Sequence, residues 1–177
     1  MAIIHRATIS PTKAELLHGV LGGPVTVLGS YRFDDPDGEV GVEAFVVRRG
    51  AAVEHVVMTY RGDPLVGAEG HLISTMEHSA LGRRWVYDGS HDPVARACFE
   101  RALRGDQEQA VEEVWDGDGR IGAREPTARL TVVGDPGPGA DASLVIARVI
   151  DPSPDLGRGP RLRVEWDGGS AVVASLV

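Results

Sequence analysis

The residue types that could perform hydrolysis occur together in the run Ser90-His91-Asp92. A serine hydrolase needs a nucleophile, a base and an orienting carboxylate that converge from different parts of the fold. Three consecutive residues cannot form that arrangement among themselves, and Ser170 lacks the Gly-x-Ser-x-Gly motif. We therefore interpret Ser90-His91-Asp92 as a loop followed by a helix cap. We expect no catalytic residues in this chain.

Six histidines could in principle hold a metal ion. His71 and His78 with Glu77 come nearest to a cluster, but their spacing on a strand puts the two histidines on opposite faces, and no His-Glu-x-x-His motif is present. His55 shares a face with two valines, which favours a hydrogen-bonded core residue over a ligand. Cys98 is the only cysteine, so thiolates cannot build a zinc site and we expect it to be buried. We expect no metal and no cofactor.

Phosphoryl transfer would require a cradle for the phosphates and carboxylates for magnesium. The chain has no Gly-x-x-x-x-Gly-Lys, no His-Arg-Asp and no Asp-Phe-Gly motif, and its only lysine, Lys13, lies at the start of an expected helix. We therefore expect no self-contained kinase activity.

Aromatic and charged side chains alternate near residue 85. Aromatic faces stack on sugars and anchor protein interfaces, and arginine pairs with carboxylates. The candidate interaction surface comprises Arg83, Arg84, Trp85, Tyr87 and Asp88. The alternative, which we favour, is that Trp85 and Tyr87 are core residues under the helix that begins at Asp92.

Composition and charge exclude several classes of protein. A length of 177 residues with 42% hydrophobic and 25% charged residues is typical of one globular domain, here expected over residues 1–177. The net charge of −8 repels phosphate backbones, and Arg48-Arg49 and Arg83-Arg84 are only pairs, so we expect no nucleic-acid partner. No stretch approaches the roughly 18 apolar residues of a membrane span, and we expect a cytoplasmic protein.

The elements that position these residues follow from periodicity. Residues 2–9 favour a strand. Ser10-Pro11 predicts a helix over 11–20, with a capping box of Thr12 and Glu15 as the alternative start, ending at Gly22-Gly23. Three strands then follow over 24–33, 39–49 and 53–60, joined by short turns into an antiparallel meander. Their expected inward residues are Val25, Val27, Tyr31, Phe33, Val40, Val42, Ala44 and Val46, and Glu39, Glu43 and Arg49 are expected on the opposite face.

Two further strands are expected over 71–77 and 83–88, followed by a better-defined helix. Asp92 is its expected cap, Pro93 its first residue, and Gly105 suits its C-terminal position. The apolar stripe of this helix, expected to pack on the sheet, is Ala95, Cys98, Phe99, Ala102 and Leu103.

The last third of the chain is β-prone. Residues 107–115 fit either a helix or a strand, and the choice stays open. Strands are expected over 128–133 and 143–150, and a final hairpin turns at Asp167-Gly168-Gly169. The loops at 135–141 and 151–160 are too short for domain linkers.

The first two-thirds of the chain resemble a known family. The resemblance rests on Tyr31-Arg32-Phe33-Asp34-Asp35-Pro36, on Thr59-Tyr60-Arg61-Gly62 and above all on the stretch from Glu77 to Asp88. Over about residues 1–105 the chain resembles stand-alone actinobacterial proteins that are similar to the N-terminal cap domain of maltokinase, and residues 106–177 add strands and a hairpin.

This resemblance implies an α+β fold, with a curved antiparallel β-sheet packed on a helix in a cystatin-like arrangement. The cap of the full-length kinases does not supply the catalytic carboxylates, so kinase activity is not carried over. We expect a non-catalytic accessory domain that binds a kinase-like or glucan-pathway protein. The alternative is a small sugar- or α-glucan-binding module that uses the Trp85 face. A free edge of the meander or of the final hairpin would let two copies pair into a homo-oligomer.

Overall fold

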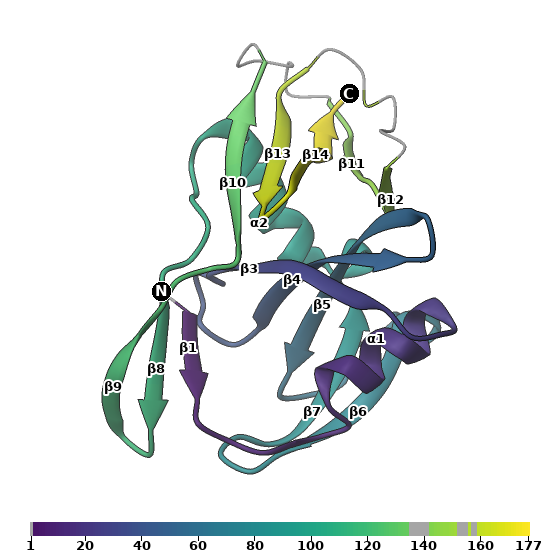
Figure 1. The fold of residues 1–177 in the computed structure, drawn as a ribbon. Coiled ribbons are helices and arrows are strands. Elements are labelled where there is room, and N and C mark those ends of the chain that lie inside the picture. The colour runs from purple at the N-terminus through teal and green to yellow at the C-terminus, as the bar shows by residue number, and fades with distance from the viewer. Residues whose placement is uncertain (1, 135–141, 152–155, 157–158) are drawn as a thin grey trace.

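The computed structural model describes residues 2–134, 142–151, 156 and 159–177. Strands make up 52% of the described residues, which also contain two α-helices, so the fold is α+β with a predominance of antiparallel sheet. Figure 1 shows a strongly curled sheet in the middle, with smaller sheets on either side of it. Among the described residues, no helix is long and apolar enough to cross a bilayer.

The central sheet has seven strands in the order β2-β6-β7-β5-β4-β3, with β12 paired to β5. Its strands, all antiparallel to their neighbours, are β2 (Ile9–Ser10), β3 (Thr26–Phe33), β4 (Gly41–Arg49), β5 (Ala52–Arg61), β6 (Leu72–His78), β7 (Gly82–Asp88) and β12 (Val149–Asp151). The predicted meander is therefore confirmed as β3-β4-β5.

Helix α1 (Lys13–Leu21) begins later than the proline signal predicted. Thr12 is its N-cap and forms a reciprocal capping box with Glu15, so the alternative start is the correct one. The helix ends at Gly22, whose φ of 70° places it in the left-handed region that glycine tolerates best. Leu16 and Leu17 pack with one face of the central sheet to form a small core.

Helix α2 (Pro93–Arg104) has the predicted cap at Asp92, the predicted first residue and the predicted C-terminal Gly105. All five residues of its predicted stripe, including Cys98, are buried. Short 3-10 helices, η1 (Glu69–His71) and η2 (Gly89–His91), precede β6 and α2. The sequence pattern was thus sufficient to place α2 correctly.

Two smaller sheets complete the molecule. One, in the order β1-β8-β9, comprises β1 (Ala2–His5), β8 (Glu112–Asp116) and β9 (Gly119–Arg124). The other, in the order β10-β13-β14-β11, comprises β10 (Ala128–Val133), β11 (Leu144–Ile146), β13 (Arg161–Trp166) and β14 (Gly169–Leu176). The open choice at residues 107–115 is resolved as a strand from Glu112, and the predicted final hairpin is confirmed as β13-β14.

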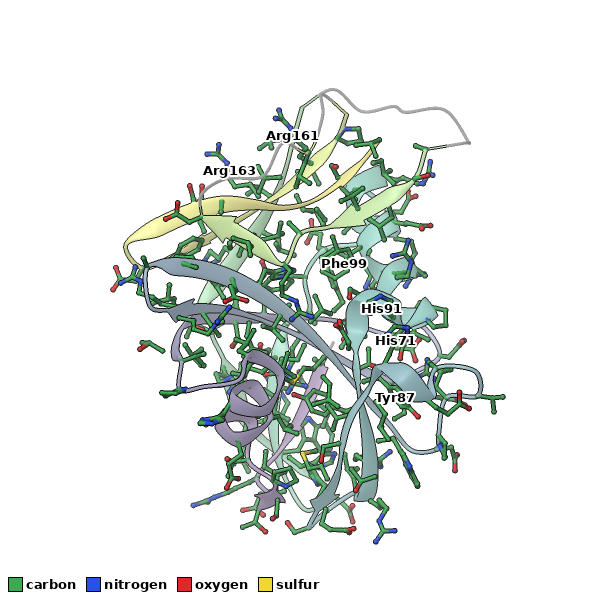
Figure 2. The ribbon with its side chains drawn as sticks, turned by 90° about the vertical axis from the view of Figure 1, so that its right-hand side faces the viewer. His71, Tyr87, His91, Phe99, Arg161 and Arg163 are labelled. Atoms are coloured by element: carbon green, nitrogen blue, oxygen red, sulfur yellow. The ribbon has the colours of Figure 1, made fainter. Side chains whose placement is uncertain are left out.

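The main core lies between α2, one face of the central sheet and the four-stranded sheet. It joins Tyr31 and Phe33 of β3 with Phe99 of α2 and with Leu162 and Val164 of β13. Figure 2 shows Phe99 between α2 and the strands that cover it. Both parts of the chain, before and after residue 105, therefore share one core.

Four predictions about strands are wrong in detail. The strand expected over 2–9 divides into β1 (Ala2–His5) and β2, which belong to different sheets. Val27 is 48% exposed, because the pairing of β3 with β4 shifts register between Val27 and Gly29 and turns the side chain outward. Glu43 is buried rather than solvated, because the face it shares with Phe45 and Val47 is covered by α1. The run 143–150 divides into β11 and β12, which belong to different sheets. The loop at 135–141 lies outside the described residues, as does most of the loop at 151–160.

Candidate functional site

A cleft of about 680 Å³ lies between β1 and one end of the central sheet. Such a volume is within the usual range of small-molecule sites. Strand β1 and the turn between β3 and β4 form part of its wall, and Lys13, Tyr60, His78 and Arg84 bring polar groups to it. Lys13 comes from the first turn of α1, and the other three come from β5, β6 and β7.

A buried carboxylate beside this cleft organises three donors. Glu43 is only 1% exposed. Its Oε1 accepts a 2.7 Å hydrogen bond from Lys13 Nζ, and its Oε2 accepts bonds from Arg32 Nη2 at 2.9 Å and from the Tyr60 hydroxyl at 3.1 Å. The carboxylate thus accepts hydrogen bonds from α1, β3 and β5. A buried charge of this kind is tolerated only when it is paired and hydrogen-bonded.

The pKa values in this cluster follow from burial and charge. Burial alone would raise the pKa of Glu43, but Arg32 and Lys13 outweigh it and lower that pKa. Burial lowers the pKa of Lys13, and the attraction of Glu43 only partly opposes this. Burial and the negative charge of Glu43 raise the pKa of Tyr60, which therefore stays a neutral donor. Glu43 is consequently ionised at neutral pH.

A second buried carboxylate secures the start of α2. Asp92 is fully buried and receives hydrogen bonds from Arg61 Nε and Nη2, both at 2.7 Å, and from the Thr59 hydroxyl at 2.7 Å. It also caps α2 by accepting from the backbone N–H of Val94. These contacts hold α2 against β5, and they account for Asp92 as a structural residue.

The predicted interaction surface is divided by the pleat of β7. Trp85 is half-buried and Arg83 is exposed, with its Nε donating to Glu77 at 2.7 Å. Tyr87 is buried, and its hydroxyl accepts from the backbone N–H of Leu65, so of the two aromatic residues that the alternative placed in the core Tyr87 is the buried one. On the face of β7 that carries Arg83, Trp85 and Tyr87, the side chains of Arg83 and Trp85 are the ones that reach solvent.

The other two predicted residues of the surface have separate surroundings. Arg84 alternates with Arg83 and Trp85 on β7, lines the cleft and donates from Nη2 to the Leu81 carbonyl at 2.8 Å. Asp88 accepts from Arg148 Nη2 at 2.6 Å and from the Ser90 hydroxyl at 2.6 Å. The five predicted side chains therefore lie on two faces of β7 and have different surroundings.

Four of the histidine rings contact each other in two pairs whose members are far apart in the sequence. His71 stacks on His91 with ring centroids 3.8 Å apart, as Figure 2 shows, whereas the ring of His78 meets that of His5 edge to face at 6.0 Å. No group of three or more metal-ligating side chains is found in the part of the chain that the structure describes. His55 is buried as predicted, and its ring nitrogens lie 2.8 Å from the Tyr31 hydroxyl and 3.2 Å from the Ala147 carbonyl oxygen.

Sequence reasoning missed the Glu43 cluster altogether. Alternation on β4 placed Glu43 on a polar face, but Phe45 and Val47 on that same face were a signal that it is covered as well. The contributions of Lys13 and Tyr60 depend on contacts between distant segments, which no local pattern reveals.

Comparison with known proteins gives one result. The family model of the maltokinase N-terminal cap domain matches residues 18–92, from within α1 through the central sheet to the cap of α2. No curated protein and no solved structure matches the chain significantly. The most specific stretch of the predicted resemblance, from Glu77 to Asp88, lies inside the matched residues. Over residues 18–92 this chain is similar to the maltokinase N-terminal cap domain.

Proposed function

We propose that this chain is a non-catalytic accessory domain of the maltokinase-cap type, which docks on a sugar kinase or another enzyme of α-glucan metabolism. The observation that carries the proposal is the match over residues 18–92, which includes five strands of the central sheet. In the same proposal, the curled sheet and α2 form a cystatin-like arrangement, and the protein acts in the cytoplasm.

The outer edge of β6 offers a docking surface. Strand β2 pairs only with His78 and Glu77, so residues 72–75 have no strand on that side within the described part of the chain. Leu72 at this edge is 40% exposed. An open edge of this kind accepts a strand from a partner protein through backbone hydrogen bonds.

The opposite edge of the sheet is covered at residues 30 and 32 of β3. The backbone N–H of Ser30 on β3 donates to the hydroxyl of Thr127 at 2.8 Å, and the Arg32 carbonyl accepts from Ala110 at 2.8 Å. Docking by strand addition is therefore assigned to β6, where it would also allow two copies of the chain to pair.

The test is direct binding between this purified chain and the catalytic lobes of a maltokinase from the same organism, prepared without their own cap. We expect a dissociation constant of about 10 µM or below, as for a transient interface. Leu72→Lys should weaken the complex at least about tenfold, because the charge would be buried at the edge. Val27→Lys is the matched control, since Val27 is similarly exposed on the opposite edge strand.

The outcomes separate the two parts of this proposal. Absence of binding at about 100 µM would refute docking on a kinase. Binding that both variants weaken equally would leave the partner in place but refute the β6 edge. Sedimentation of the chain alone tests pairing of two copies, which Leu72→Lys should abolish if the same edge is used.

A sugar-binding module is the second candidate, supported by the partly exposed Trp85 next to the exposed Arg83 on β7. An indole face beside a cation is suited to stacking on a sugar ring. Titration with maltose and longer α-glucans should then shift the NMR signal of the Trp85 indole. No shift at millimolar sugar would exclude this candidate.

A further inference from the structure

Basic side chains gather at one end of the cleft beside β1. Strand β1 crosses this cleft. At one end of β1 the Ala2 backbone N–H donates to the Val111 carbonyl, near the end of β3. At its other end the ring centroid of His5 lies 6.0 Å from that of His78 on β6. His5, His78, Arg84 and Lys13 all line the cleft. The four side chains come from four different elements, so the tertiary fold creates this grouping.

These groups repel one another. Burial lowers the pKa of His78, and the charges of His5, Arg84 and Lys13 each lower it further. The positive charges of Arg32 and Arg124 likewise lower the pKa of Lys13. At neutral pH the positive charge here comes from Arg84 and Lys13, and the lowered pKa of His78 leaves its ring a neutral donor. An anion held between the two cations in a partly enclosed space would remove their repulsion.

The carboxylates near these cations are already engaged. Glu43 accepts from Lys13, Arg32 and Tyr60, as described above. Glu112 on β8 is paired with Arg124 through Oε2, and its Oε1 is buried without a hydrogen-bond partner among the described residues. The carboxylate of Asp35, in the turn after β3, accepts the backbone N–H groups of Asp37, Glu39 and Val40. The acidic residues that line the cleft, Asp34, Asp35 and Glu39, belong to this turn, so negative charge collects at the end nearest β3.

Two guanidinium groups beside the cleft have donors to spare. Arg32 Nε and Arg84 Nε are buried and have no hydrogen-bond partner within the described residues. A buried donor without a partner carries a desolvation cost that a ligand oxygen can remove after a small rotation of the side chain. The Arg84 donor belongs to the end of the cleft that His5, His78 and Lys13 line, whereas Arg32 on β3 is already attracted by Glu43 and Glu112.

We propose that this cleft binds a small phosphorylated molecule, with its phosphate at the end formed by His5, His78, Arg84 and Lys13. A phosphate monoester is close to a dianion at neutral pH and has three acceptor oxygens, which suits several converging donors. The uncharged hydroxyl-bearing part of the ligand lies along the floor near Tyr60, toward the acidic turn after β3. This site does not depend on docking to a kinase.

The test is calorimetric titration of the full chain with glucose 6-phosphate, inorganic phosphate, glucose and gluconate at low ionic strength. We expect glucose 6-phosphate to bind more tightly than inorganic phosphate, and glucose not to bind at about 10 mM. Because the attraction is electrostatic, binding should weaken as salt is added. Equal binding of gluconate would refute the preference for phosphate.

Arg84→Met and Arg83→Met form a matched pair of variants. Both remove one arginine from β7, but Arg84 lines the cleft, whereas Arg83 is exposed and paired with Glu77. We expect Arg84→Met to weaken glucose 6-phosphate at least about tenfold, Arg84→Lys to retain most of the affinity, and Arg83→Met to change it less than about twofold. His5→Gln is a second cleft variant, for use if Arg84→Met does not fold.

Three results would overturn the proposal. One is the absence of binding by either phosphate at about 10 mM. Another is the same loss of affinity in Arg84→Met and Arg83→Met, which would indicate attraction by net charge alone. The last is unchanged affinity in folded Arg84→Met and His5→Gln. None of these results bears on kinase docking, so the two proposals can fail separately.

Discussion

Lys13 and Glu43 form a 2.7 Å ion pair that joins the first turn of α1 to the middle of β4. The Lys13 side chain is 32% exposed, whereas that of Glu43 is only 2% exposed. The pair Arg83–Glu77 has the same distance of 2.7 Å, but both of its side chains are 62% exposed. The two pairs therefore differ in burial and not in geometry, which makes them a natural comparison.

Glu43→Gln should destabilise the protein by about 2 to 4 kcal/mol, because it leaves Lys13 and Arg32 next to a neutral group in a buried site. Lys13→Met should cost about 1 kcal/mol or less, because its side chain is partly solvated. Glu77→Gln, in the exposed pair, should change the free energy of unfolding by less than about 0.5 kcal/mol. Urea unfolding at pH 7 measures all three. Equal effects of Glu43→Gln and Glu77→Gln would contradict the importance of burial.

Asp92 both caps α2 and neutralises Arg61, and two substitutions separate these contributions. Asp92→Ala should destabilise by about 3 to 5 kcal/mol, since it removes the cap and leaves Arg61 and Thr59 without their acceptor. Asp92→Asn keeps a capping oxygen and should cost clearly less. Thermal and urea unfolding provide the comparison. If the two variants are equally unstable, the cap contributes nothing beyond the charge.

Because His55 is buried, we predict that the folded protein loses stability in acid. Burial lowers its pKa in the folded protein to about 4, from an ordinary value of 6.5, and the nearby charge of Arg148 adds to this effect against the opposing Ala147 carbonyl. Between these two pH values the unfolded chain binds a proton that the folded chain does not, so stability falls as the pH falls from 6.5 to 4. The contribution is about 3 kcal/mol.

Unfolding curves of the wild type and of His55→Gln over this pH range provide the measurement. The variant should be less stable at pH 7 but should show a shallower decline toward pH 4, because the titrating group has been removed. His18→Gln, which removes a histidine from the exposed side of α1, is the matched control. An identical slope in wild type and His55→Gln would show that other groups cause the acid sensitivity.

Two glycine-to-alanine changes should act in opposite directions. A Cβ at Gly29, on the bulge of β3, would lie 2.8 Å from the Thr127 carbonyl oxygen and 3.0 Å from Ala128 Cβ. Because a backbone atom blocks it, Gly29→Ala should cost about 1 to 3 kcal/mol. Gly19 in α1 has nothing within 4 Å of such a Cβ, so Gly19→Ala should stabilise by about 0.5 to 1 kcal/mol. Thermal unfolding of both variants decides whether β3 and the start of β10 fit as tightly as described.

The shared core predicts that residues 1–105 do not fold alone. Val164 and Leu162 of β13 pack in the same core as Phe99 of α2, so truncation would expose the apolar face of α2 and of the sheet. We expect a truncated chain to bind a hydrophobic dye and to unfold without a cooperative transition, whereas the full chain unfolds in a single step. Cooperative unfolding of the fragment would show that the C-terminal strands form a separate unit.

The sequence was sufficient for features whose causes are local. Asp92, Pro93 and Gly105 defined α2 because a cap, a first-turn proline and a left-handed glycine act through neighbouring backbone atoms. The turns of the meander and of the final hairpin were recognisable for the same reason. The similarity to the maltokinase cap was also recognisable, because it rests on residues that are consecutive along the chain.

Only the tertiary structure decided which faces are buried and which charged groups meet. Alternation along β4 could not show that α1 covers the face of Glu43, nor that Lys13 and Tyr60 would reach the same carboxylate from distant segments. Alternation along β7 is enough to separate Arg83 from Arg84, two neighbours expected on one surface, but only the packing of the elements decided that Arg84 lines the cleft. The physical reason is that burial and Coulomb energy depend on distance in space, which only the packing of the elements determines.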